Sequence, residues 1–355
     1  MINTISKTDQ LKKILLEEIK SGVFKPGDKL PSILNICQKY KVSKHTVSQA
    51  LSNLNEIGVI NLVHGKTTRV SDAPFKNNIE ILYWGLGKAE QQEFWQEFYL
   101  GIVDEIEKNP GYTYNARRTP GERLIKEFSL HDLKDSIGVL VLGTCSPYLL
   151  ELLKRYGVKF VLVYDKTNSN NIPFVSSDFT MVMPELVRLF KANNCSRIAF
   201  IGSLGENNHK EINSSKLEIF KQALVDNGLK VSEDLIISAA HDKIRTGYFA
   251  MKSLIDTDNV PDGIFLSSDS LALGVYRALH EAGLKIPEDI KIVGCDNLDV
   301  AEFLIPSLTS IELSRYEIGA TAAKKLIAEI KGEKDIEKIY FTPKIIARES
   351  LNLEK

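Results

Sequence analysis

Three short stretches near the start of the chain decide the fold of its first part. They read SGVFKPGDKLPS at residues 21–32, VSKHTVSQAL at 42–51 and HGKTTRV at 64–70. In order, they supply a Pro-Gly turn, a helix start at a serine, a short inter-helix turn, another helix and a hairpin tip that contains glycine. This order predicts a small helical domain closed by a β-hairpin, and it is more specific than the helical period of any single segment.

Apolar residues recur at helical spacing in three segments of this head. The first helix is predicted over residues 8–21, and Gly22 ends it. A second helix starts at Ser32, whose hydroxyl can cap the helix or contact a phosphate. Ser43 caps a third helix, which buries an apolar stripe at Val47, Ala50, Leu51 and Leu54. Residues 1–72 therefore read as a winged helix-turn-helix domain.

The third helix has polar residues on its outer side near the N-terminus. In a helix-turn-helix these positions face the major groove, where Gln suits an adenine edge and Lys suits guanine or a phosphate. The hairpin forms a wing whose basic residues can reach the minor groove or the backbone. The predicted DNA-contacting residues are Ser32, Ser43, Lys44, His45, Thr46, Ser48, Gln49, Gly65, Lys66 and Arg69. The alternative is a three-helix domain with a solvated polar face.

The charge of the chain is unevenly distributed. The whole sequence carries a net charge of −1, yet residues 1–72 hold eleven Lys and Arg against six Asp and Glu. The rest of the chain holds 34 basic and 40 acidic residues. A basic head on an acidic body suggests that only the head meets a polyanion, although a modest excess of this size also arises by chance.

Composition indicates an ordinary globular protein of two or three domains. The chain has 355 residues, 43% of them hydrophobic and 26% charged. We expect neither a signal peptide nor a membrane span, since no apolar run approaches the ~18 residues that a span needs. The cysteines, Cys37, Cys145, Cys195 and Cys295, form no CxxC pair. We therefore expect a reduced, cytoplasmic protein without a metal site or cofactor.

Residues 4–72 resemble the GntR-type winged helix domain. The usual run of Leu-Pro-Ser, an acid and Arg appears as LPSIL at 30–34, so Leu34 stands where a phosphate-contacting Arg is usual. Ser48 replaces the second Arg of the recognition helix, and the wing's Gly-x-Gly appears as GKT at 65–67. The resemblance implies DNA binding with fewer backbone contacts, and the operator code cannot be transferred from it.

A linker over residues 73–78 leads to a larger body in which short apolar strands alternate with amphipathic helices. This alternation predicts an α/β fold with doubly wound parallel sheets, in two series that would face each other across a cleft. Strands are predicted at 79–84, 138–142, 160–164, 197–201, 263–266 and 291–295. Helices are predicted at 93–108, 147–156, 181–193, 215–227, 245–255, 268–282 and 316–330.

Four stretches of this body closely resemble the LacI/GalR-type effector domain, which has the fold of type I periplasmic sugar-binding proteins. They read NNCSRIAFIG at 193–202, SDSLALG at 268–274, IPEDIKIVGCDN at 286–297 and PSLTSI at 306–311. The resemblance covers residues 79–355. It implies two lobes joined by three crossovers, with lobe 1 at about 79–178 and 315–331 and lobe 2 at about 179–314 and 332–355. A GntR-type head on this body resembles bacterial sugar-responsive regulators of the arabinose-repressor type.

The resemblance also implies which residues bind a ligand in the cleft. Asp296, at a strand end, matches the family's ligand-binding Asp, and Lys216 stands where the family clamps its ligand with Arg. Asp242 falls near a position that is often aromatic, so a ring that stacks on a sugar would come from Trp84, Phe94 or Trp95. The candidate ligand-binding residues are Trp84, Trp95, Asp165, Asp178, Lys216, Asp242, Ser268, Asp269 and Asp296. The alternative is capping for each acid and ordinary packing for the tryptophans.

We expect a homodimeric regulator that binds a palindromic operator and is released by a small sugar-like effector, most simply a monosaccharide. The alternatives are a sensor of a nucleobase or a sugar acid and, less favoured, an enzyme acting in the cleft. The run GLGK at 85–88 lacks the spacing of a phosphate-binding loop, and no motif places a nucleophile beside a base. We therefore predict no catalytic residues.

Overall fold

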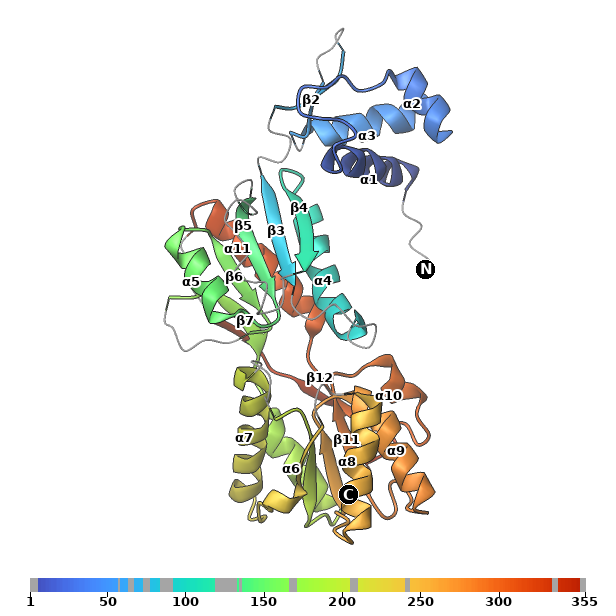
Figure 1. Cartoon of the computed structure of the whole chain (residues 1–355), viewed down its shortest axis with the longest axis vertical. Helices are drawn as coiled ribbons and strands as arrows, with labels where there is room; N and C mark the ends of the chain where they lie inside the picture. Colours follow the sequence, from blue (N-terminus) through green and yellow to red (C-terminus); the bar gives the residue numbers. More distant parts are fainter. Residues whose placement is uncertain are drawn as a thin grey trace.

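A computed structural model describes residues 6–56, 58–62, 67–72, 77–83, 92–118, 133, 136–165, 171–204, 210–239, 243–333 and 338–351. The head stands apart from the body, and the body consists of two stacked lobes, each built on its own sheet (Figure 1). The parallel α/β fold with a helix-turn-helix at its N-terminus is confirmed.

The head is a three-helix domain with a short antiparallel hairpin. Its elements are α1 (Lys7–Lys20), α2 (Ile33–Tyr40), α3 (Lys44–Glu56), β1 (Ile60–Asn61) and β2 (Arg69–Val70). Ser32 caps α2 by accepting a hydrogen bond from the Asn35 amide at 3.3 Å. The helices enclose a core of fully buried aliphatic side chains, among them Leu11, Leu15, Ile36, Val47, Leu51 and Leu54.

Lobe 1 is a six-stranded parallel sheet in the order β13-β7-β6-β5-β3-β4. Its strands are β3 (Asn78–Tyr83), β4 (Thr113–Arg118), β5 (Ser136–Leu142), β6 (Phe160–Val163), β7 (Phe174–Ser177) and β13 (Lys338–Phe341). The helices are α4 (Gln92–Glu107), α5 (Pro147–Arg155) and α11 (Arg315–Ile330). α4 and α11 pack together on one face of the sheet, whereas α5 packs on the other.

Lobe 2 has the strand order β14-β12-β11-β10-β8-β9, with only the edge strand β14 antiparallel. Its strands are β8 (Ile198–Gly202), β9 (Ile236–Ser238), β10 (Gly263–Leu266), β11 (Lys291–Cys295), β12 (Thr309–Glu312) and β14 (Lys344–Ile346). The helices are α6 (Val182–Ala192), α7 (Lys210–Asp226), α8 (Ile244–Asp256), α9 (Ala272–Glu281) and α10 (Asp299–Phe303), with short 3-10 turns η4 (Glu233–Leu235) and η6 (Asp269–Leu271). α6 and α7 cover one face of the sheet, and α8 and α9 cover the other.

The chain passes between the lobes three times, from β7 to α6, from β12 to α11 and from β13 to β14 (Figure 1). The last passage corrects the sequence-based boundary that assigned all of residues 332–355 to lobe 2. β13 pairs in parallel with β7, and the ring of Tyr340 lies 5.2 Å from that of Phe174, so residues 338–341 belong to the sheet of lobe 1. The helix predicted over 268–282 also begins differently, as the 3-10 turn η6.

Candidate DNA-binding surface and effector cleft

The exposed side of α3 carries four of the predicted DNA-contacting residues, namely Lys44, His45, Ser48 and Gln49. They lie opposite the buried side chains of Val47, Ala50 and Leu51. Ser43 accepts a hydrogen bond from the Thr46 amide at 3.1 Å, and the two hydroxyls of this pair lie 2.8 Å apart. Ser43 and Thr46 therefore shape the start of the helix, while the other four residues are accessible to a groove.

The other predicted contacts lie on the second helix and the wing. Ser32 is exposed at the start of α2, and Leu34, two residues further along, is 67% exposed. Arg69 donates a hydrogen bond to the Gly27 carbonyl at 2.8 Å, which ties the wing to the Pro-Gly turn. Gly65 and Lys66, which the sequence predicts at the wing tip, lie outside the described residues.

In lobe 2, Asp296 and Lys216 come together at the carboxyl ends of two parallel strands. Asp296 directly follows β11, has a φ of 104° and is 4% exposed. Lys216, on α7, donates to the Ser267 carbonyl at 3.1 Å, and its Nζ lies 3.6 Å from the Cys295 Sγ. The Lys216 ammonium also lies 5.1 Å from the centre of the Phe179 ring. A buried cation and a buried carboxylate thus share this edge of the sheet.

Lobe 1 contributes an aromatic cluster to the same region. Tyr164 follows β6, and its ring lies 5.4 Å from that of Phe94, 6.1 Å from that of Trp95 and 5.0 Å from that of Phe98. Burial raises the pKa of the Tyr164 phenol, the Lys216 ammonium opposes this rise, and the Asp296 carboxylate adds to it. The contacts of Arg315 with the Phe94 ring and the Asp296 carbonyl connect this cluster to the charged pair of lobe 2.

Arg315 lies between the two groups of residues, and sequence reasoning missed it. It is the first residue of α11, where the chain re-enters lobe 1. Its guanidinium lies 5.7 Å from the centre of the Phe94 ring and donates a hydrogen bond to the Asp296 carbonyl. Tyr164 was also missed. Its position directly after a buried strand was the available signal, whereas nothing local distinguishes Arg315.

Asp269 departs from the predicted cleft-lining role. Its side chain is fully buried beneath β11 and accepts hydrogen bonds from the Leu298 amide at 2.9 Å and the Ser310 hydroxyl at 2.8 Å. Burial raises the pKa of this carboxyl well above its usual range, and the Asp296 carboxylate adds to the rise. Ser268 is buried and caps η6. Asp269 is therefore turned into lobe 2, whereas Ser268, at 7% exposure, stays a candidate for the cleft.

Two acids of lobe 1 accept hydrogen bonds from other residues of the same lobe or of the segment that leaves it. Asp165 is buried and accepts a hydrogen bond from the Cys145 amide at 2.8 Å. Asp178 accepts from the amide and the hydroxyl of Thr180, at 3.0 and 2.9 Å, where the chain leaves lobe 1. The sequence analysis gave capping as the alternative role for each acid, and these hydrogen bonds to backbone amides are consistent with that alternative. Trp84 and Asp242, the remaining candidates, lie outside the described residues.

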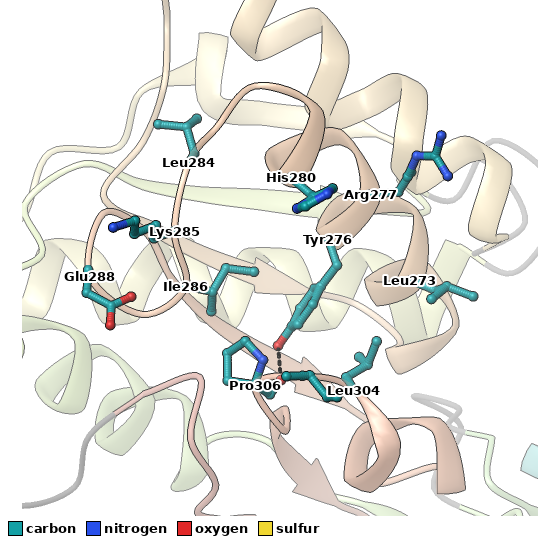
Figure 2. A pocket seen from close by; sticks show the side chains of 11 residues that line it. Leu273, Tyr276, Arg277, His280, Leu284, Lys285, Ile286, Glu288, Leu304 and Pro306 are labelled. Atoms are coloured by element: carbon teal, nitrogen blue, oxygen red, sulfur yellow. Dashed lines mark hydrogen bonds between the residues drawn. The ribbon is translucent and has the colours of Figure 1, made fainter.

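A second hollow opens on the outer side of lobe 2, which the sequence analysis did not anticipate. A cavity of about 570 Å³ lies between α9 and the loops that follow α9 and α10. Figure 2 shows the side chains that line it. The Tyr276 hydroxyl donates to the Pro306 carbonyl at 3.0 Å across its floor. Next to the cavity, Phe303 is 80% and Ile305 93% exposed.

Within the described ranges, no group of three or more His, Cys, Asp or Glu residues is placed to hold a metal ion. No helix among these residues is both long and apolar enough to span a membrane.

Comparison with known proteins identifies the family. Residues 187–351 match the periplasmic binding protein-like domain, and residues 7–70 match the bacterial regulatory proteins of the gntR family. The chain is 33% identical over 264 residues to the transcriptional repressor PurR of Pasteurella multocida, covering 72% of this chain and 77% of that protein. It is 30% identical over 241 residues to catabolite control protein A of Priestia megaterium, covering 66% and 70%. The chain belongs to the LacI/GalR family of transcriptional regulators.

Within the LacI/GalR family, this member carries a gntR-type head in front of the shared body. The transcriptional regulator GanR of Bacillus subtilis is 22% identical over 343 residues, covering 91% of this chain and all of that protein. Among solved structures, a complex of the regulator CelR with cellobiose superposes with a TM-score of 0.69 at 21% identity, covering 87% and 92% of the two chains. A LacI-family regulator from Enterococcus faecium with bound ribose gives 0.64 at 25% identity, covering 79% and 100%.

Proposed function

We propose that this regulator is a cytoplasmic, homodimeric repressor whose interlobe cleft binds a sugar-like effector, and that the effector releases the operator. The observation that carries the proposal is the pairing of Asp296 and Lys216 in lobe 2 with the aromatic cluster of lobe 1. Relatives of the body have been solved with cellobiose and with ribose.

The two sides of the cleft suit the two faces of a sugar. A carboxylate accepts hydrogen bonds from ring hydroxyls, and an ammonium or guanidinium donates to them. The flat C–H face of the sugar packs on an aromatic ring, for which Phe94, Trp95 and Tyr164 are placed. A ligand that contacts both lobes stabilises their closed arrangement, because it binds that arrangement more tightly than an open one.

The effector is sought by thermal shift of the full chain against monosaccharides, disaccharides, sugar phosphates, sugar acids and nucleobases. We expect a sugar to raise the melting temperature. Calorimetry on Asp296→Ala should show a loss of about 1.5–3 kcal/mol in effector binding, because charged hydrogen bonds are lost in a closed cleft. Unchanged affinity in this variant would contradict the assignment of Asp296.

A nucleobase is the second candidate, and the aromatic cluster favours it as well. A planar purine stacks on rings such as those of Phe94 and Trp95, and PurR is among the relatives. The same panel separates the two, since a nucleobase sensor responds to purines and ignores neutral sugars.

DNA binding is assigned to the exposed side of α3. The affinity for a genomic operator fragment should fall steeply with salt, as expected when Lys side chains neutralise phosphates. Lys44→Ala should reduce the log–log slope by ~1 if Lys44 contacts one phosphate, whereas Gln49→Ala should relax the preference at one base pair by ~1–3 kcal/mol. An affinity independent of salt would refute this surface.

We assign the contact between the two copies of the proposed dimer to the outer face of lobe 2. The exposed apolar side chains there come from α8, α9 and α10 and the loop after it: Ile244, Phe249, Leu273, Phe303 and Ile305. Ile305→Asp should convert a particle of about twice 39.8 kDa into a monomer in light scattering. Met181→Asp changes another exposed apolar residue, the N-cap of α6, a helix that covers the opposite side of the lobe 2 sheet, and should leave the dimer intact. A dimer that survives Ile305→Asp would rule out this face.

A further inference from the structure

The loop that follows β11 is held by four successive backbone amides. The Asp296 amide donates to the Ile311 carbonyl at 2.8 Å and the Asn297 amide to the Ser310 hydroxyl at 3.1 Å. The Leu298 amide donates to the Asp269 carboxylate at 2.9 Å. All three acceptors belong to lobe 2, so this part of the loop is anchored from within its own lobe.

The fourth amide is held by the other lobe. Asp299 begins α10, and its amide donates to Glu93 Oε1 at 2.6 Å. Glu93 lies in the first turn of α4, in lobe 1. The next residue of α4, Phe94, reaches the opposite end of the loop indirectly, because it packs against Arg315, which donates to the Asp296 carbonyl. Two neighbouring residues of α4 thus secure both ends of the loop.

The conformation of the loop explains why it needs an anchor on each side. Asp296 has a φ of 104°, which favours glycine and is adopted by an aspartate only when its surroundings impose it; Asn297, at 46°, lies in the left-handed region that asparagine adopts readily. Asp296 is the residue assigned to the effector. Whatever stabilises this turn therefore also fixes the direction of the carboxylate in the cleft.

We propose that Glu93 is a positioning residue of the effector cleft, which holds the Asp296 loop in its binding geometry only while the lobes are together. The proposal rests on the proposed function, because it takes Asp296 as an effector ligand. Lobe separation removes the fourth anchor, and the loop relaxes. Lobe closure and the geometry of the site are thereby coupled through this hydrogen bond, in addition to the bond from Arg315 to the Asp296 carbonyl.

The bond is accessible to solvent, which makes it measurable. Glu93 and Asp299 line a polar cavity of about 550 Å³ together with Glu97, Glu312 and Lys344. Hydrogen exchange of the Asp299 amide, resolved to single residues by fragmentation mass spectrometry on the full chain without effector or DNA, reports the bond directly. A failure to find a sugar effector therefore leaves this measurement unaffected.

In Glu93→Ala, we expect exchange at the Asp299 amide to rise by about threefold to tenfold. The Asn297 and Leu298 amides should also exchange faster, whereas the β11 amides should keep their rates. Glu93→Gln retains a side-chain carbonyl that accepts the bond and should restore most of the protection. Glu97→Ala, one turn further along α4 and in the same cavity, is the matched control and should have no effect.

Two results would overturn the proposal. Unchanged exchange at Asp299 in Glu93→Ala would show that the bond does not hold in solution. Faster exchange at Asp299 alone, with Asn297 and Leu298 as in the parent chain, would reduce Glu93 to a local cap of α10 that does not position Asp296.

Discussion

At the scale of single residues, two aspartates at neighbouring strand ends differ in their surroundings. Asp296 stands at the end of β11, near Lys216 and the aromatic cluster of lobe 1. Asp269 lies beneath it, without contact to solvent, and accepts hydrogen bonds from the Leu298 amide and the Ser310 hydroxyl. Asp269 thus supports the loop that follows β11 from the interior of lobe 2, which is a structural role.

Asp269 should make stability depend on pH. Burial raises its pKa in the folded chain, so the folded chain keeps this proton at pH values where the unfolded chain has lost it. The contribution of the group to the free energy of unfolding is therefore full below the ordinary Asp pKa, and it falls as the pH rises toward the folded pKa. Urea unfolding at a series of pH values measures this decline.

Two variants of Asp269 test the cause of that decline. Asp269→Asn keeps an oxygen for the Leu298 amide but does not titrate, and it should flatten the pH dependence. Asp269→Ala leaves the Leu298 amide buried without its acceptor and should cost about 1–3 kcal/mol. An identical pH dependence in Asp269→Asn would assign the titration to another group.

Leu34 should limit the affinity for DNA. It is 67% exposed on α2, at the position where the GntR-type pattern has a phosphate-contacting Arg. Leu34→Arg should tighten operator binding and steepen the log–log salt dependence by ~0.9, the value for one added phosphate contact. Ile14→Arg places the same charge on an exposed site of α1. If both variants steepen the salt dependence equally, the added positive charge and not a specific phosphate contact at residue 34 causes the change.

At the scale of elements, the two helices that carry Phe94 and Arg315 cross at reciprocal glycines. A Cβ on Gly101 of α4 would clash with the Tyr316 carbonyl oxygen, and a Cβ on Gly319 of α11 would clash with the Phe98 carbonyl oxygen. Backbones therefore meet directly at this crossing, and glycine is required on both sides. The distance between α4 and α11 in turn sets the spacing of the aromatic cluster and the Arg315 guanidinium.

Gly319→Ala should therefore destabilise lobe 1. An added methyl group has no room between the two backbones, and overpacking of this kind costs about 1–3 kcal/mol. Gly111→Ala meets nothing within 4 Å and is the control. Thermal unfolding followed by circular dichroism compares the two. Equal melting temperatures of Gly319→Ala and Gly111→Ala would show that α4 and α11 accommodate the added methyl group without loss of stability.

At the scale of the whole molecule, three passages of the chain join two lobes that each have their own sheet (Figure 1). An effector that contacts both lobes favours the closed arrangement, and in a dimer this changes the separation of the two heads. By linkage, the factor by which effector changes operator affinity equals the factor by which operator changes effector affinity.

We expect effector to weaken operator binding by about 5–150-fold, the usual range of allosteric coupling. Fluorescence anisotropy with a labelled operator, with and without the sugar found in the thermal-shift panel, gives the factor. Calorimetry of the same sugar, with and without operator, should show that operator weakens sugar binding by the same factor. Equal operator affinities under both conditions would show that the head and the body act independently.

The sequence alone determined the features that depend on neighbours along the chain. The Pro-Gly turn, the caps at Ser32 and Ser43 and the buried strands β8, β10 and β11 follow from local backbone preferences and short apolar runs. The strand end at Asp296 was located for the same reason.

Only the tertiary structure decided what joins distant segments. The short strands β4, β7, β9, β12, β13 and β14 escaped prediction, because pairing with neighbours and not local pattern makes them strands. The inward turn of Asp269, the bond from Arg315 to Asp296 and the bond from the Asp299 amide to Glu93 depend on how sheets and lobes pack. The last of these joins residues 206 positions apart, and only packing between the lobes brings them together.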